Sequence, residues 1–155
     1  MMSMPRGGWS RRGLLALAGA AGCLTWLRPR PASATAQDAD DHVRRLLGGA
    51  TARPGRVALV LQEVAESGAN EPVRVVVDSP MTAADHVKAI HVVAEGNPFP
   101  GVSSWYFGPR AARAEVGFRM RLARTQVVRA YAVMADGSVW EARQEIKVTI
   151  GGCGG

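Results

Sequence analysis

The sequence predicts an all-β protein, an immunoglobulin-like antiparallel β-sandwich with a short N-terminal helix and a flexible C-terminal Gly-Cys arm. Three observations predict this architecture. About seven short segments rich in Val or alternating in polarity are separated by turns every 8 to 12 residues or so. A short amphipathic segment precedes them, and the last of them runs directly into "IGGCGG" at the end of the chain.

The helix is expected within residues 37–52, "QDADDHVRRLLGGATA". Acidic residues crowd its start, whereas Arg44 and Arg45 stand at its end, which is the charge order that the helix dipole favours. Gly48 and Gly49 follow and are expected to end it. One apolar stripe is formed by Val43, Leu46 and Leu47.

From residue 56 the hydrophobic period changes from helical to two. The segment 113–122 alternates strictly, so one face of this strand is expected to be buried and the other wet. Asp136-Gly137, between two strand-like segments, is a strong signal for a tight hairpin. The expected strands are 56–62, 73–79, 86–95, 102–107, 113–122, 125–134 and 138–150. In the last of them one face carries Trp140, Ala142, Ile146, Val148 and Ile150.

The excess of positive charge belongs to the N-terminal region. The chain has 19 Lys and Arg against 13 Asp and Glu, and five of the arginines but none of the acids precede residue 37. The rest of the chain is close to neutral, which argues against a nucleic-acid partner. The N-terminal region resembles a twin-arginine export signal. Ser10-Arg11-Arg12 precedes an apolar run that is too short to span a membrane, and Ala34 and Ala36 form an A-x-A cleavage site.

We therefore expect a cleaved leader at 1–36, a folded domain at 37–150 and an arm at 151–155, in a periplasmic protein without a membrane anchor. Of the two cysteines, Cys23 lies in the leader, so the mature chain keeps Cys153 alone. A disulfide within the mature chain is excluded, and an odd exported cysteine indicates an intermolecular bond or a reactive thiol.

The folded domain offers no convincing catalytic or metal site in its sequence, and no cofactor is expected. His86 and His91 are five residues apart in a strand, so we expect them on opposite faces. Asp78, Asp85 and His86 lie near a turn without a serine placed to complete a triad. No phosphate loop and no zinc spacing occurs. The aromatic run "SSWYF" is interpreted as core plus interface.

Cys153 is therefore the candidate site. Its neighbours Gly151, Gly152, Gly154 and Gly155 have no side chains, so they leave the sulfur accessible. No cation stands close in sequence to lower the pKa of the thiol. From Ile150 the arm reaches roughly 10 Å to Cys153 at about 3.4 Å per residue. The sequence thus predicts a thin arm that enters the cleft of another protein.

Three blocks resemble the SoxY family, sulfur-substrate carriers of the periplasmic Sox thiosulfate-oxidising system. They are "VDSPMTAADHVKAIHVVAEGNPFPGV", "FGPRAARAEVGFRMRLARTQVVRAYAVMADGSVW" and "VTIGGCGG", and the likeness runs from about residue 40 to the end. The resemblance implies an immunoglobulin-like sandwich paired with SoxZ as a heterodimer. It also implies covalent attachment of thiosulfate-derived sulfur at Cys153, on the arm of Gly151, Gly152, Gly154 and Gly155.

In that family the carrier itself is not an enzyme. The haem enzyme SoxAX conjugates thiosulfate to the cysteine, manganese-dependent SoxB releases sulfate, and in many organisms SoxCD oxidises the remaining sulfur. Two alternatives stay open: an exported structural module in which Cys153 forms an intermolecular disulfide, and a soft-metal chaperone using Cys153 with Met81, Met120 and Met134. The Val-rich strands "VALVL" and "VRVVV" are candidates for the SoxZ interface.

Overall fold

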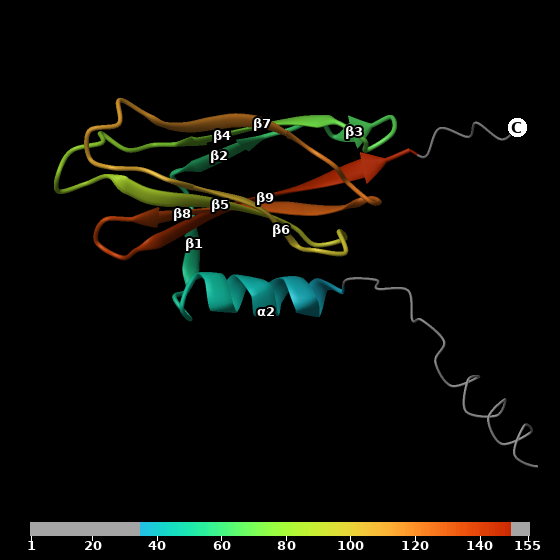
Figure 1. The fold of residues 1–155 in the computed structure, drawn as a ribbon, viewed down its shortest axis with the longest axis horizontal. Coiled ribbons are helices and arrows are strands. Elements are labelled where there is room, and N and C mark those ends of the chain that lie inside the picture. The colour runs from blue at the N-terminus through green and yellow to red at the C-terminus, as the bar shows by residue number, and fades with distance from the viewer. Residues whose placement is uncertain (1–34, 150–155) are drawn as a thin grey trace, which may run out of the picture. The chain divides into compact units, whose positions relative to one another are not determined.

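The structure, a computed structural model, describes residues 35–149 (Figure 1). The expected helix and the expected strands are present, with bounds shifted by a few residues, and two further short strands occur. The elements are α2 (Ala36–Leu46), β1 (Ala52–Pro54), β2 (Val57–Val60), β3 (Val64–Ala65), β4 (Glu71–Val77), β5 (Val87–Ala94), β6 (Gly101–Tyr106), β7 (Ala114–Met120), β8 (Gln126–Met134) and β9 (Val139–Val148).

The strands form two sheets that face each other, which confirms the all-β sandwich. The larger sheet has the order β1-β9-β8-β5-β6, with β3 also paired to β9, and the smaller has the order β2-β4-β7. Figure 1 shows the smaller sheet lying over the larger one. The sandwich is mostly antiparallel, but β1 and β3 both pair with β9 in parallel. The sequence pattern did not predict these two pairings, because two- and three-residue strands carry no periodicity of their own.

The core lies between the sheets and follows the expected alternation. Val73, Val75 and Val77 of β4 are buried there, whereas Pro72 and Arg74, at the alternate positions, are exposed. The outward side chains of this small sheet therefore meet solvent. The Asp136-Gly137 hairpin is confirmed: Met134 N–H donates to Ser138 O at 2.9 Å, and Gly137 has a φ of 84°.

The larger sheet is covered on its other face as well. Helix α2 packs there (Figure 1), and Ala39, Val93, Tyr131 and Val139 form a second buried cluster. Arg129 holds this layer together, since its guanidinium, only 10% exposed, pairs with Glu95 of the turn after β5 and with Asp40 of the helix. The strand β8 is therefore buried on both faces, in keeping with its nearly continuous run of apolar residues.

Helix α2 begins with a capping box in which Thr35 and Asp38 exchange hydrogen bonds. Thr35 N–H donates to Asp38 Oδ2 at 2.8 Å, and Asp38 N–H donates to Thr35 Oγ1 at 3.2 Å. The expected leader otherwise lies outside the described residues. Cleavage after Ala36 would remove the capping residue, and that cleavage position stays a prediction. The helix in the described part of the chain is not long and apolar enough to span a membrane.

Candidate functional site

Strand β9 leads the chain toward the expected site. Cys153 and its neighbours Gly151, Gly152, Gly154 and Gly155, the expected arm, lie outside the described residues. The structure shows instead how the chain is held immediately before it. We call residues 147–149 the arm root.

The arm root is held on one side by β3. Val64 and Ala65 pair in parallel with Lys147 and Val148. Lys147 N–H donates to Glu63 O at 2.9 Å, and Thr149 N–H donates to Ala65 O, also at 2.9 Å. The Thr149 hydroxyl donates a second bond to Ala65 O at 3.2 Å. Strand β9 is therefore fixed up to the last residue that the structure describes.

On the other side the arm root meets the loop between β7 and β8. Val148 N–H donates to Thr125 Oγ1 at 3.0 Å. Asn97 and the buried Gln126 position this loop, since Ala123 N–H and Gln126 Nε2 both donate to Asn97 Oδ1 at 3.0 Å. Gln126 Oε1 also accepts from Gly96 N–H at 2.7 Å. This network of hydrogen bonds thus fixes the conformation of the loop that binds β9.

Gly68 lets the chain after β3 pack closely against the arm root. Its φ is 62°, in the left-handed region that favours glycine. A Cβ atom there would lie 2.5 Å from Leu122 O and 3.0 Å from Val148 Cγ1. Leu122 N–H in turn donates to Gly68 O at 2.7 Å. This packing requires glycine at position 68.

The fixed root sets the reach of the expected site. Four peptide units separate Thr149 from Cys153, so the thiol lies at most about 14 Å from the root at roughly 3.4 Å per residue. A protein that acts on Cys153 must therefore place its reacting groups within about that distance of the surface around Thr149, or enclose the arm in a channel no deeper than this.

The prediction that His86 and His91 lie on opposite faces was wrong. Both line one cavity of about 480 Å³ on the outer face of the larger sheet. A bulge in β5 between Val87 and Ala89 inserts a residue, which changes the side on which later residues project. His86 Nδ1–H donates to Thr82 O at 3.1 Å, and His91 Nδ1 bonds with Ser104 Oγ at 2.7 Å.

Burial, and to a lesser extent the nearby His42, lowers the pKa of His91 below its ordinary value, so this imidazole is neutral near pH 7. Within residues 35–149 no group of three or more His, Cys, Asp or Glu side chains is placed to hold a metal ion. The three methionines considered for a metal chaperone, Met81, Met120 and Met134, are all buried in the core.

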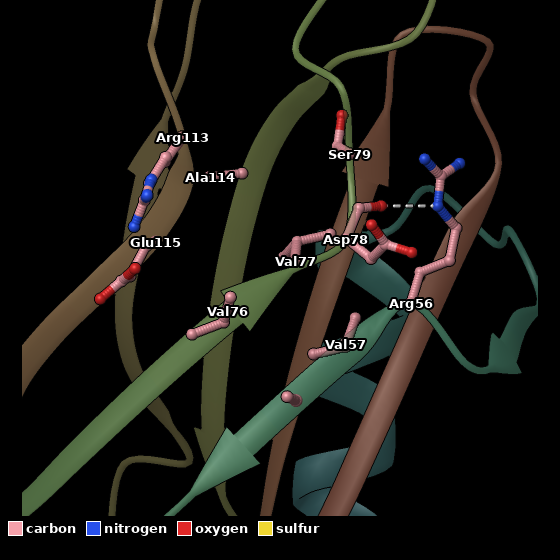
Figure 2. Close-up of a pocket in the computed structure, with 10 residues that line it drawn as sticks. Arg56, Val57, Val76, Val77, Asp78, Ser79, Arg113, Ala114 and Glu115 are labelled. Carbon is pink, nitrogen blue, oxygen red and sulfur yellow. Dashed lines mark hydrogen bonds between the residues drawn. The ribbon is translucent and has the colours of Figure 1, made fainter.

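The polar residues near Asp85 are bonded to one another. The Ser79 hydroxyl donates to the backbone oxygen of Asp85 at 3.3 Å, and the Asp85 carboxylate pairs with Arg56 at 2.9 Å. Figure 2 shows the adjoining cavity of about 570 Å³, where Arg56 donates to Asp78 O. Glu115 on its far side is paired with Arg74. These charges are neutralised by their neighbours.

The aromatic run divides between core and surface, as the sequence indicated. Trp105 packs on Phe118 of the opposite sheet at a ring distance of 4.6 Å, and Phe107 contacts the same core. Tyr106 between them is 78% exposed. Sequence reasoning missed the roles of Thr125, Gly68 and β3 at the arm root, because contacts between segments 20 or more residues apart leave no local pattern.

Comparisons with known proteins give a family and a fold. The family model described as "Sulfur oxidation protein SoxY" matches residues 43–153, a range that includes position 153. The structure is similar to that of the sulfur carrier protein SoxY from Chlorobium limicola f thiosulfatophilum. The two are 29% identical, and the match covers 75% of this chain and 100% of that chain with a TM-score of 0.64.

A superoxide reductase (neelaredoxin) from Ignicoccus hospitalis is also similar, at 25% identity and a TM-score of 0.54, over 76% of this chain and 95% of that one. A putative superoxide reductase from Thermotoga maritima, 19% identical with a TM-score of 0.52 over 59% of this chain and 84% of that one, shares the fold alone. The comparison with curated protein sequences finds no match.

Proposed function

Since the chain belongs to the SoxY family of sulfur oxidation proteins, we propose that it is a periplasmic carrier that holds thiosulfate-derived sulfur on Cys153. The observation that carries this proposal is the family match, which runs through position 153. A structural neighbour described as a sulfur carrier protein supports it. The fixed arm root adds a physical reason, because it presents the end of the chain from one defined point on the domain.

In the proposed cycle the carrier supplies the thiol and its partners supply the chemistry. SoxAX forms an S–S bond between Cys153 and the outer sulfur of thiosulfate and accepts the two electrons that this oxidation releases, which gives Cys-S-S-SO₃⁻. SoxB then adds water across the terminal S–S bond, so that Cys153 keeps a persulfide and hydrogen sulfate leaves. Where SoxCD is present, it oxidises the outer sulfur before SoxB acts again.

The arm suits this sequence of steps for electrostatic reasons. The intermediates are anionic, and each partner enzyme must stabilise a different transition state in its own site. Glycines at 151, 152, 154 and 155 bring neither charge nor bulk into those sites. We further propose that the chain pairs with SoxZ and is exported through the twin-arginine pathway together with this partner.

Intact-mass measurement tests the proposal. The chain in complex with SoxZ is incubated with thiosulfate and SoxAX, and then with SoxB. The expected masses are those of a thiosulfonate adduct and then of a persulfide, both absent from Cys153→Ser. An unmodified wild-type thiol in the presence of active SoxAX would refute the carrier role. A non-reducing gel separates the alternative, since a structural disulfide would give a covalent dimer that is insensitive to thiosulfate.

A further inference from the structure

Strand β6 forms an open edge of the larger sheet. It pairs with β5 and with no other strand in the described part of the chain. Phe107 N–H, directly after the strand, donates to Lys88 O of β5 at 2.9 Å. Because the direction of backbone groups alternates along an antiparallel pair, Ser104 and Tyr106 point their N–H and C=O groups away from β5. These groups are free to pair with another strand.

This edge lacks the usual protection against pairing. Natural edge strands are blocked by charged side chains, by proline or by being very short. The six residues of β6, "GVSSWY", contain no charge and no proline. The edge strand of the other sheet on this side, β7, carries Glu115 and Arg119. The other edge of that sheet, β2, is also without charge or proline but has only four residues. The longer uncharged edge, β6, is therefore the better candidate for an edge that a partner covers.

Exposed aromatic residues stand at both ends of β6. Phe99 in the preceding turn is 84% exposed, and Tyr106 at the end of the strand is 78% exposed. They are the two aromatic side chains among the large hydrophobic residues that are exposed within residues 35–149. Aromatic side chains bury about 150–250 Å² each and are enriched at protein interfaces. Their placement at the two ends of β6 indicates that a partner would contact the strand along its whole length.

The surface beside each aromatic residue is hollowed. A cavity of about 530 Å³ lies beside Phe99, between the β5–β6 turn and helix α2, and the cavity of about 480 Å³ described above lies beside Tyr106. No carboxylate lines the second cavity, but Lys88 does. Lys88 and Arg110, in the turn after β6, are exposed, and neither side chain makes an ion pair or hydrogen bond with another described residue. This end of the edge is therefore basic.

We propose that β6 accepts an antiparallel or parallel strand from the partner subunit of the carrier complex. The added strand pairs with the outward backbone groups of Ser104 and Tyr106, buries Phe99 and Tyr106, and brings acidic side chains opposite Lys88 and Arg110. Backbone groups at an edge are satisfied by an extended chain, and the local charge selects an acidic one. The choice of SoxZ as that partner rests on the proposed function.

The location differs from the Val-rich strands that the sequence suggested. Most valines of β4 are buried in the core, so their apolar character is already explained by folding. Val60 of β2 is 56% exposed on the opposite sheet and provides a matched control for an exposed apolar residue away from β6. The two surfaces can therefore be compared in one protein.

Backbone substitution gives the sharpest test. Ser104→Pro removes a backbone N–H that makes no bond within the sheet, so the fold is retained. The docking edge, however, loses this hydrogen-bond donor, and the proline ring stands in its place. Ser104→Ala loses the same hydroxyl bond to His91 but keeps the N–H. With SoxZ as the probe, isothermal titration is expected to show at least tenfold weaker binding for Ser104→Pro and for Tyr106→Lys. Binding within about threefold of wild type is expected for Ser104→Ala and Val60→Lys.

Amide hydrogen exchange tests the same surface in the wild-type chain. In the complex the amides of Ser104 and Tyr106 are expected to exchange at least tenfold more slowly than in the free chain. Protection confined to β2 and β4, or equal SoxZ binding by Ser104→Pro and Ser104→Ala, would overturn the proposal. So would protection of β6 by a second copy of this chain without SoxZ. Sulfur loading of Cys153 is measured separately, so adducts that form on a carrier with an unprotected β6 would refute this inference while leaving the proposed function intact.

Discussion

Substitution of Gly68 tests whether close packing against the arm root stabilises the fold. The matched control is Gly48, because the two glycines have nearly the same φ, 62° and 60°, but differ in surroundings. A Cβ at Gly68 would lie 2.5 Å from Leu122 O, whereas a Cβ at Gly48 would meet nothing within 4 Å. Both Ala variants share the cost of a left-handed backbone, about 1–2 kcal/mol. Gly68→Ala alone must also displace backbone, which adds about 1–3 kcal/mol of overpacking.

Urea denaturation measures the two free energies of unfolding. We expect Gly68→Ala to lose about 2–5 kcal/mol and Gly48→Ala about 1–2 kcal/mol. Hydrogen exchange is expected to quicken at Val148 and Thr149 in Gly68→Ala and to stay unchanged there in Gly48→Ala. Equal losses for the two variants, within about 0.5 kcal/mol, would show that packing at Gly68 contributes nothing and would refute the reasoning.

Three further predictions concern the helix layer and its surroundings. Arg129→Met is expected to cost about 3–5 kcal/mol in denaturation, because it leaves Glu95 without its buried partner, whereas loss of the more exposed partner in Asp40→Asn is expected to cost about 1 kcal/mol or less. The lowered pKa of His91 means that the unfolded chain binds this proton more readily. The free energy of unfolding is therefore expected to be at its full value above about pH 6.5 and to fall as pH drops toward the folded pKa; a titration in which His91→Gln keeps the wild-type slope would contradict this. A chain that begins at residue 37 lacks the Thr35 cap, so its first helical turn is expected to exchange amide hydrogens faster than in a chain that begins at residue 33, and equal rates would show that the cap is dispensable.

Local signals in the sequence predicted the elements whose stability is itself local. Asp136-Gly137 specified a hairpin because glycine adopts a positive φ without strain, and the acidic start and basic end of α2 match the helix dipole. The strict alternation of β7 identified its buried face before the opposite sheet was known. Each of these signals depends on residues within a few positions of one another.

Contacts between distant segments escaped the sequence pattern. The bulge in β5 placed His86 and His91 on one cavity, against the simple parity of their spacing. Burial of β8 on both faces followed from the packing of α2, a contact between segments that are 89 residues apart at Asp40 and Arg129. In both cases a segment far away in the sequence determined which side chains are buried or brought together.

The sequence by itself predicts an accessible cysteine at position 153, since the glycines around it have no side chains that could cover the sulfur. It also determined the β-sandwich, because a period of two in hydrophobicity follows from the strand geometry of each segment alone. The tertiary structure alone decided how residues 147–149 are held and which edge is left open. Thr125, β3 and Gly68 meet β9 from segments 23 to 84 residues away in the chain. β6 is an edge because, among the described strands, it pairs with β5 alone.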